Sequence, residues 1–194
     1  MFKSTGDYCA VQLKHERSTR MPQIDDTDRR LLAALQRDGR LSNAQLSEQV
    51  NLSPSACHRR VQRLEQEGWI RGYVALVDPR KVARPATVFV EITLSGQADE
   101  VLDAFEKAVA RVPEVLECHL MAGTADYLLK VVARDTDDFA RLHRRHLASL
   151  PGVAQIQSSF ALRTVRQTTA LPMRSGRSEM SVTEVDPHHP QRAM

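Results

Sequence analysis

Residues 41–68, LSNAQLSEQVNLSPSACHRRVQRLEQEG, predict two helices joined by a tight turn. The first helix is expected over residues 43–50, with Ser42 as its N-cap. The residues 51–53 form a polar break, and Asn51 tolerates the left-handed backbone that ends helices. Ser53 is expected to cap the second helix, because Pro54 suits a first helical position, where a missing N–H removes no hydrogen bond. The second helix then runs to residue 67 and ends at Gly68.

The second helix has two chemically distinct sides at about 100° per residue. Its apolar side, formed by Cys57, Val61 and Leu64, is expected to pack on the domain, so the opposite polar side is free to enter a DNA major groove. The alternative to DNA binding is that this polar side is only a charged surface in contact with solvent. Arg60 lies between the two sides, where an ion pair within the protein competes with a phosphate contact. The predicted DNA-binding residues are Ser53, Ser55, His58, Arg59, Gln62 and Arg63.

A further helix precedes this pair and a strand follows it. The segment DDTDRRLLAALQRD predicts a helix capped by Asp25 or Asp26. Residues 21–70 are therefore expected to form a trihelical helix-turn-helix DNA-binding domain. Residues 69–77, WIRGYVALV, have strand-type composition and are interpreted as a wing or a hinge strand within a connecting segment, residues 71–85.

The second half of the chain has a different pattern, which predicts a domain over residues 86–168. A strand from residue 87, a helix over 98–111, two strands over 115–121 and 127–133, a helix over 136–150 and a strand over 153–165 follow in order. The order βαββαβ is the ferredoxin-like arrangement, so the fold class is α+β. Both helices would cover one sheet face, and a second subunit is the simplest way to bury the other face.

Composition limits the kind of protein that the chain can be. Residues 86–165 carry 8 basic and 11 acidic residues, so the rest of the chain has a net charge of +6, which favours a separate DNA-facing module. The three cysteines form no CxxC pair, which indicates a reducing compartment. No signal peptide or membrane helix is recognisable, and a cytoplasmic location is expected. Residues 1–20 and 169–194 are expected to be a disordered leader and tail.

The order of elements, together with LSNAQLSEQVNLSPSACHRRVQRLEQEGWIRGYVALVDP and AGTADYLLKV, resembles the Lrp/AsnC (feast/famine) family of transcriptional regulators. The resemblance covers residues 24–168, and the 20-residue leader and the tail depart from it. That family's motif usually carries a glycine near Ala83 or Arg84, which this chain lacks. The resemblance implies a sequence-specific DNA-binding regulator that dimerises through its C-terminal domain and often assembles into octamers.

The resemblance also implies a small effector, commonly an amino acid, bound between C-terminal domains of neighbouring dimers. A glycine-containing turn offers backbone N–H groups to a carboxylate, and a side-chain carboxylate suits an ammonium group. Without the family, Gly123 and Asp126 are more often simple hairpin-turn residues. The effector-binding residues implied are Gly123, Thr124, Asp126, Tyr127, Ser158 and Ser159.

Enzymatic and metal-binding functions are not expected. The sequence contains no Gly-rich phosphate loop after a strand, no nucleophile elbow and no HExxH. His143 and His146 share a helix face near His119, but no acid or cysteine completes a metal site, so His146 is expected to be packed and His143 solvated. No cofactor is expected. Two alternatives to an effector-responsive regulator stay open: an architectural DNA-binding protein without a ligand, and a metabolite-binding module whose helical domain contacts proteins.

Overall fold

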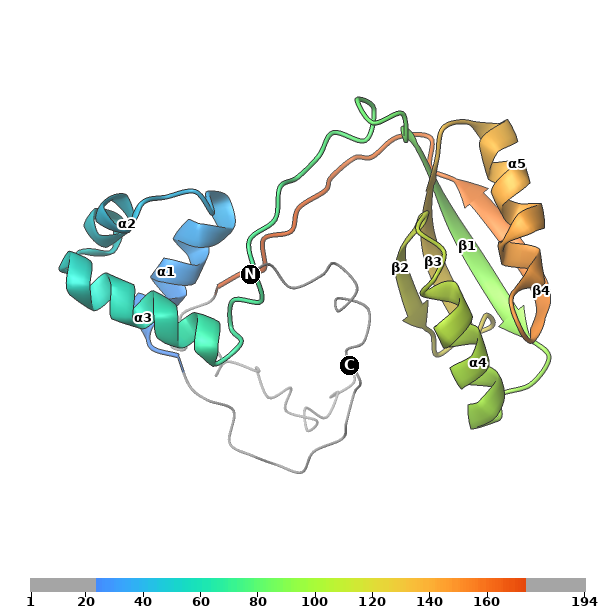
Figure 1. Cartoon of the computed structure of the whole chain (residues 1–194), viewed down its shortest axis with the longest axis horizontal. Helices are drawn as coiled ribbons and strands as arrows, with labels where there is room; N and C mark the ends of the chain where they lie inside the picture. Colours follow the sequence, from blue (N-terminus) through green and yellow to red (C-terminus); the bar gives the residue numbers. More distant parts are fainter. Residues whose placement is uncertain (1–23, 174–194) are drawn as a thin grey trace, which may run out of the picture. The chain divides into compact units, whose positions relative to one another are not determined.

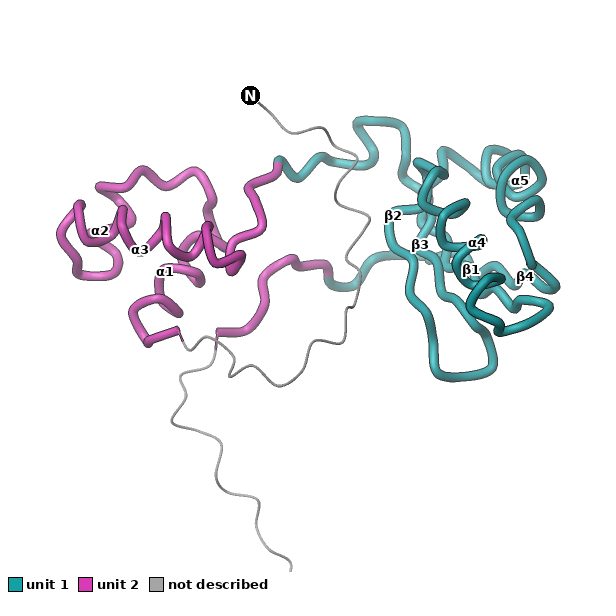
Figure 2. Tube along the Cα trace, turned by 60° about the horizontal axis from the view of Figure 1, so that its bottom comes forward, with its two compact units in different colours: residues 1–15, 75–166 teal, residues 16–74, 167–194 magenta. Residues whose placement is uncertain are grey.

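The computed structural model describes residues 24–173, which divide into two compact units (Figures 1 and 2). One unit holds residues 24–74 and 167–173 and contains the helices α1 to α3, and the other holds residues 75–166 and contains the sheet. The predicted leader, residues 1–20, lies outside the described residues, as does most of the predicted tail. In the described start of that tail, the backbone of Leu171 exchanges hydrogen bonds of 2.6 and 3.1 Å with the Gln36 side chain.

The helical unit consists of α1 (Asp26–Arg37), α2 (Asn43–Val50) and α3 (Pro54–Gln66). Each helix begins at a polar residue whose side chain accepts a hydrogen bond from a backbone N–H of the first turn: Asp25, Ser42 and Ser53. Asn51 has a φ of 55° and turns the chain between α2 and α3 as predicted. These caps confirm the predicted helix starts. The three helices share one apolar core of Leu31, Leu32, Ala34, Leu46, Val50, Cys57 and Leu64.

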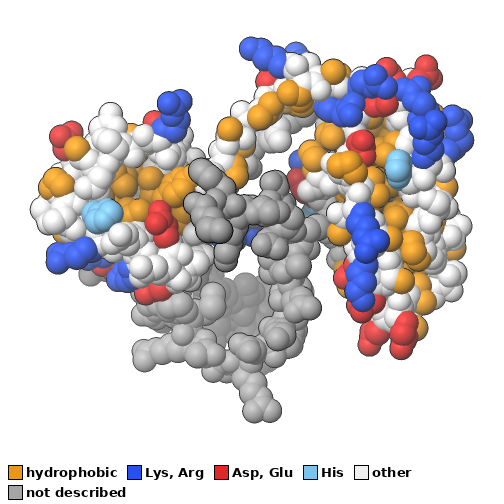
Figure 3. All heavy atoms as spheres, viewed as in Figure 1, with side chains coloured by type: hydrophobic (Ala, Val, Ile, Leu, Met, Phe, Trp, Pro, Cys, Tyr) orange, Lys and Arg blue, Asp and Glu red, His pale blue; other side chains and the backbone are white. Residues whose placement is uncertain are grey.

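The strand predicted over residues 69–77 is not formed, so that prediction was wrong for the single chain. Trp69 and Ile70 bend back and pack against the helical core, which leaves no wing after α3. Residues 71–78 have no regular structure and no strand partner among residues 24–173. A β-strand requires backbone hydrogen bonds to a neighbouring strand, and strand-type composition alone does not provide that neighbour. The apolar side chains of Val74 and Leu76 are consequently 74% and 79% exposed, and hydrophobic atoms line this segment in Figure 3.

The second unit is a four-stranded antiparallel sheet with two helices, in the predicted order βαββαβ. Its elements are β1 (Ala86–Leu94), α4 (Asp99–Val109), β2 (Val115–Leu120), β3 (Tyr127–Ala133), α5 (Thr136–Arg145), the 3₁₀ turn η2 (Leu147–Ser149) and β4 (Val153–Phe160). The strand order is β2-β3-β1-β4. Alternate residues of β1 and β3 pack with Phe105 of α4 and Phe139 of α5, so both helices cover the same sheet face (Figure 1). The fold class is confirmed.

Some details of this unit differ from the sequence-based expectation. The side chain of Asp135 caps α5, and α5 ends at Arg145 instead of the predicted residue 150. The apolar residues Leu116, Cys118 and Leu120 alternate along β2 but are exposed, because β2 is an edge strand. Cys118 is therefore exposed, unlike the buried Cys57.

The sheet face opposite the helices is uncovered in the single chain. The register places Phe89 of β1 between Lys130 of β3 and Ser159 of β4 on this face. Phe89 is 41% exposed, and Glu91 follows it on the same face. The open face is therefore mixed in character, with apolar and charged side chains in one row.

Residues 78–84, where the family's motif usually has a glycine, form a tight turn. Ala83 has a φ of 55°, in the left-handed region that glycine adopts without strain. The turn is held by hydrogen bonds from Arg84 N to Pro79 O (2.7 Å) and from Arg80 N to the Asp78 carboxylate (2.9 Å). The left-handed backbone conformation is therefore present without the glycine, and Ala83 adopts it.

Candidate nucleic-acid interface and effector site

The helix α3 is held against the rest of its unit by its apolar side. Cys57 and Leu64 are fully buried, and Val61 packs against the same core. Burial raises the pKa of the Cys57 thiol, which therefore behaves as a small apolar group. The turn before α3 is tied to α2, because the side-chain amide of Asn43 donates to the Pro54 carbonyl at 2.8 Å. These contacts fix which side of α3 faces solvent.

The solvent-facing side of α3 carries most of the predicted DNA-binding residues. His58, Arg59 and Gln62 are exposed, and neither a hydrogen bond nor an ion pair of their side chains is found within residues 24–173. Ser53 and Ser55 are also exposed, but their hydroxyl groups lie 3.3 Å apart, and Ser53 serves as the N-cap. Exposed donors on one helix side suit contacts to base edges and phosphates.

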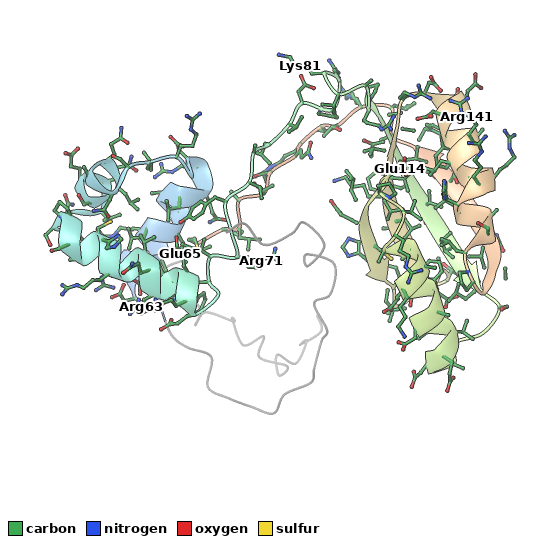
Figure 4. The ribbon with its side chains drawn as sticks, viewed as in Figure 1. Arg63, Glu65, Arg71, Lys81, Glu114 and Arg141 are labelled. Carbon is green, nitrogen blue, oxygen red and sulfur yellow. The ribbon has the colours of Figure 1, made fainter. Side chains whose placement is uncertain are left out.

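Arg60 and Arg63 are engaged inside the protein. One terminal nitrogen of Arg60 contacts carboxylate oxygens of Asp25 at 2.7 Å and Asp28 at 2.8 Å. Arg63, labelled on α3 in Figure 4, donates to the other Asp28 oxygen. The sequence left open whether Arg60 forms an ion pair within the protein or contacts a phosphate, and the structure shows the ion pair. Arg63 is thereby separated from the other five predicted DNA-binding residues.

Of the two carboxylates that contact Arg60, only Asp25 was predicted, and only as a helix cap. Asp25 and Asp28 form a capping box, in which Asp28 N donates to Asp25 at 2.7 Å and Asp25 N donates to Asp28 at 3.3 Å. Burial raises the pKa of Asp25, but the Asp28 N–H and Arg60 outweigh that effect and lower it. The pKa of Arg60 is raised, mainly by its hydrogen bonds to the two carboxylates. Spacing can reveal a capping box, but it cannot reveal a pairing with a helix 32 residues later.

The predicted effector residues divide into exposed and buried groups. Gly123 and Thr124 are exposed in the turn between β2 and β3, and nothing lies within 4 Å of the position of a Cβ added to Gly123. Asp126 is buried, and its carboxylate accepts hydrogen bonds from Leu94 N at 2.7 Å and from the Gln97 side chain at 2.8 Å. In the single chain this carboxylate therefore secures the turn to the end of β1.

Tyr127 also points into the fold, where its side chain is 1% exposed. Its hydroxyl group donates to Glu106 of α4 at 2.8 Å, and its ring lies 4.5 Å from that of Phe105. Burial, assisted by Glu106, raises the pKa of Tyr127 well above its usual value. The side chains of Asp126 and Tyr127 thus shape the turn from the inside.

The two predicted serines lie on the other edge of the sheet. Ser158 and Ser159 belong to β4, and β1 and β3 separate that strand from β2. Ser158 pairs with Val90 on the helix-covered face, and Ser159 pairs with Phe89 on the open face. One chain therefore does not bring the serines together with the turn at Gly123 and Thr124.

The histidines of the sheet unit do not form a metal site. Across residues 24–173, no group of three histidine, cysteine or acidic side chains is placed to hold a metal ion. The prediction for the α5 histidines was wrong: His146 is exposed, whereas His143 is half-buried beside Phe139 at 6.2 Å. Within the same range, no helix is long and apolar enough to cross a membrane.

Two family models match this chain, one on each unit. Residues 24–71 match a winged helix-turn-helix DNA-binding model, and residues 87–171 match the Lrp/AsnC ligand binding domain. The leucine-responsive regulatory proteins of Escherichia coli K12 and Klebsiella pneumoniae are each 41% identical to it over 152 residues, which are 78% of this chain and 93% of theirs.

Solved structures show the same fold. A Neisseria meningitidis transcriptional regulator in complex with L-Met is 39% identical, with a TM-score of 0.74, and the match covers 77% of this chain and 97% of that one. An AsnC family regulator from Agrobacterium tumefaciens is 40% identical, with the same TM-score and coverage. These relatives are transcriptional regulators, not enzymes. The chain belongs to the Lrp/AsnC family of DNA-binding transcriptional regulators and carries that family's ligand-binding domain.

Proposed function

We propose that this regulator binds its DNA site through the solvent-facing side of α3 and changes its DNA binding when an amino acid occupies the sheet unit. The observation that carries the DNA contact is the exposure of Arg59 at the middle of α3, directly opposite the buried Cys57 and Leu64. A helix inserted in the major groove reads bases with such a side. His58, Gln62 and Ser55 flank Arg59, while Ser53 and Arg63 lie at the border of the surface.

Arg59→Ala tests the DNA contact. A good base contact is worth about 1–3 kcal/mol, and about 1.4 kcal/mol is a tenfold change in affinity. We expect the affinity for a duplex selected from a random library to fall at least tenfold, measured by fluorescence anisotropy. Arg71→Ala is the matched control, because Arg71 is an exposed arginine of the same unit outside α3. Unchanged affinity in Arg59→Ala would remove Arg59 from the interface.

An amino-acid effector is supported by the ligand-binding domain match and by the L-Met complex of the Neisseria relative. The exposed turn at Gly123 and Thr124 supplies backbone groups for the effector's carboxylate. Because Ser158 and Ser159 lie on the opposite sheet edge, we propose that they reach this turn from another copy of the chain. Asp126 and Tyr127 would hold the turn in shape. Regulation then requires that the effector bind one assembly state more tightly than another.

Gly123→Val tests this site with little disturbance of the fold. A side chain added there meets nothing within 4 Å, yet it would obstruct a ligand bound on the turn. Gly96→Val is the matched control, since Gly96 lies in the same unit and is equally unobstructed. Calorimetry with the twenty amino acids should find at least one that binds the native chain and Gly96→Val, and binds Gly123→Val at least tenfold more weakly. Equal binding by both variants would move the effector site elsewhere.

We also propose that the chain forms a homodimer through the open sheet face, with dimers assembling further to octamers. The partly apolar row around Phe89 supports this, because an uncovered sheet face is normally buried by another layer. Phe89→Asp should reduce the mass measured by light scattering to that of the monomer. Phe89→Leu, which keeps the face apolar, should leave the mass unchanged. We propose a cytoplasmic location, as expected from the sequence, which the bacterial regulators among its relatives support.

A further inference from the structure

The helical unit contains one buried carboxylate, that of Asp28 on α1. Its side chain is 2% exposed, although the neighbouring acid Asp26 is 73% exposed. Among residues 24–74 of the described chain, Asp28 is the only buried acidic or basic residue. A charge in such a place requires compensation by opposite charge and hydrogen bonds.

Both oxygens of the Asp28 carboxylate are used. One accepts the Arg60 guanidinium at 2.8 Å, and the other accepts the Arg63 guanidinium and the Asp25 N–H. The side chains of Arg60 and Arg63 are only 31% and 45% exposed. Removing either arginine from Asp28 would leave a buried negative charge with less compensation, which is strongly unfavourable. These two guanidinium groups are therefore poorly available to a DNA phosphate.

Arg60 and Arg63 lie one helical turn apart on the flank of α3 that faces α1. Two attachments one turn apart to the same carboxylate oppose rotation of α3 about its own axis. Arg59 and Arg63 are also one turn apart in sequence, yet only Arg63 is drawn to α1. The apolar side of α3 limits its rotation, and the contacts to Asp28 restrict it further and decide which arginine is left facing solvent.

We infer that Asp28 is a positioning residue for DNA recognition: it holds Arg60 and Arg63 as internal anchors of α3, so that Arg59 alone of the three arginines neutralises a phosphate or reads a base. The inference rests on the proposed DNA contact by α3 and removes Arg63 from that contact. Each phosphate contact releases condensed counterions, so replacing an arginine that contacts phosphate should weaken the salt dependence of DNA affinity. The inference predicts this effect for Arg59 and not for Arg60 or Arg63.

The first experiment measures how affinity for DNA varies with salt. The full chain is titrated against two duplexes, one selected in vitro from a random library and one of random sequence. Arg59→Ala should reduce the slope of log K against log salt by about 1. Arg63→Ala should leave the slope unchanged on both duplexes while lowering affinity for the selected duplex. A slope reduced by about 1 in Arg63→Ala would overturn the inference.

Asp28→Asn gives a readout that a merely structural residue would not produce. It frees Arg63 from its buried partner, while Arg60 still contacts Asp25, so binding to the random duplex should strengthen and its salt slope should steepen by about 1. Preference for the selected duplex should fall, since α3 is no longer held in one rotation. A loss of affinity for both duplexes with an unchanged preference would contradict the positioning role.

Asp26→Asn is the matched control for net charge. It removes the same charge from α1, but the ion pair of Asp26 is with Arg29, at 3.9 Å, and within residues 24–173 no ion pair or hydrogen bond joins its side chain to α3. Binding to the random duplex should stay close to that of the native chain, and an increase equal to that of Asp28→Asn would overturn the inference. If Asp28→Asn fails to fold, as judged by Trp69 fluorescence, the Arg63→Ala slope still decides. An unchanged slope in Arg59→Ala would instead refute the proposed Arg59 contact and leave the anchoring of Arg63 to its own test.

Discussion

Replacing Gly152 by alanine tests how the packing of the helices onto the sheet is achieved. Gly152 has a φ of +74°, and a Cβ added there would lie 2.7 Å from Cγ1 of Val101 and 3.9 Å from Cδ2 of Leu94. Left-handed backbone costs a residue with a Cβ about 1–2 kcal/mol. Overpacking costs about 1–3 kcal/mol. The reduced entropy of the unfolded chain returns about 0.4–1 kcal/mol.

The expected net loss of stability is about 2–4 kcal/mol, confined to the sheet unit. Hydrogen exchange followed by mass spectrometry reports the two units separately. Amides of β1 and β3 should exchange about 30- to 800-fold faster, because about 1.4 kcal/mol corresponds to a factor of ten. Amides of α3 should be unaffected.

Alanine substitutions at two other glycines separate the backbone cost of Gly152→Ala from its steric cost. Gly96→Ala meets neither a neighbour nor an unusual φ, and should change stability by less than about 0.5 kcal/mol. Gly68→Ala has a φ of +78° and nothing within 4 Å, so it isolates the backbone term in the helical unit. A loss below about 1 kcal/mol in Gly152→Ala would refute the steric argument, because that value is the backbone term alone.

Three further changes have defined outcomes. Ala83→Gly should stabilise the sheet unit by about 0.5–1 kcal/mol in urea unfolding, because it relieves the left-handed alanine at φ 55° by more than the entropy it adds to the unfolded chain; a loss of stability would contradict this. Leu64→Ala should destabilise the helical unit by about 2–5 kcal/mol, measured by the fluorescence of Trp69, the single tryptophan; a change below about 1 kcal/mol would mean that Leu64 is not a core residue. Because burial and Glu106 raise the pKa of Tyr127, the folded sheet unit holds that proton more tightly than the unfolded chain. The stability of the sheet unit, measured as the urea midpoint of unfolding, should fall as pH rises above about 10, and it should fall less steeply in Tyr127→Phe. An equal pH dependence in both proteins would show that Tyr127 is not responsible.

The relation between sequence and structure differs between the two halves of the fold. Caps and periodicity are local, so Ser42, Asn51 and Ser53 could be assigned correctly from neighbouring residues. Strand-type patterns likewise located β1 and β3, but only the structure shows that Val88, Val90 and Ile92 share the buried face of β1. The strand predicted over residues 69–77 failed because strand formation depends on a partner that composition does not specify.

For the candidate sites, the sequence by itself determined which side of α3 is exposed and where the turn at Gly123 and Thr124 lies. Helical periodicity was sufficient to separate Arg59 from Cys57 and Leu64. Only the tertiary structure decided that Arg63 turns to Asp28, that Asp126 is occupied by Leu94 and Gln97, and that Ser158 lies on the other sheet edge. The physical reason is that each of these outcomes depends on electrostatic or hydrogen-bond contacts between residues distant in the chain, whereas helix sidedness follows from the geometry of one segment.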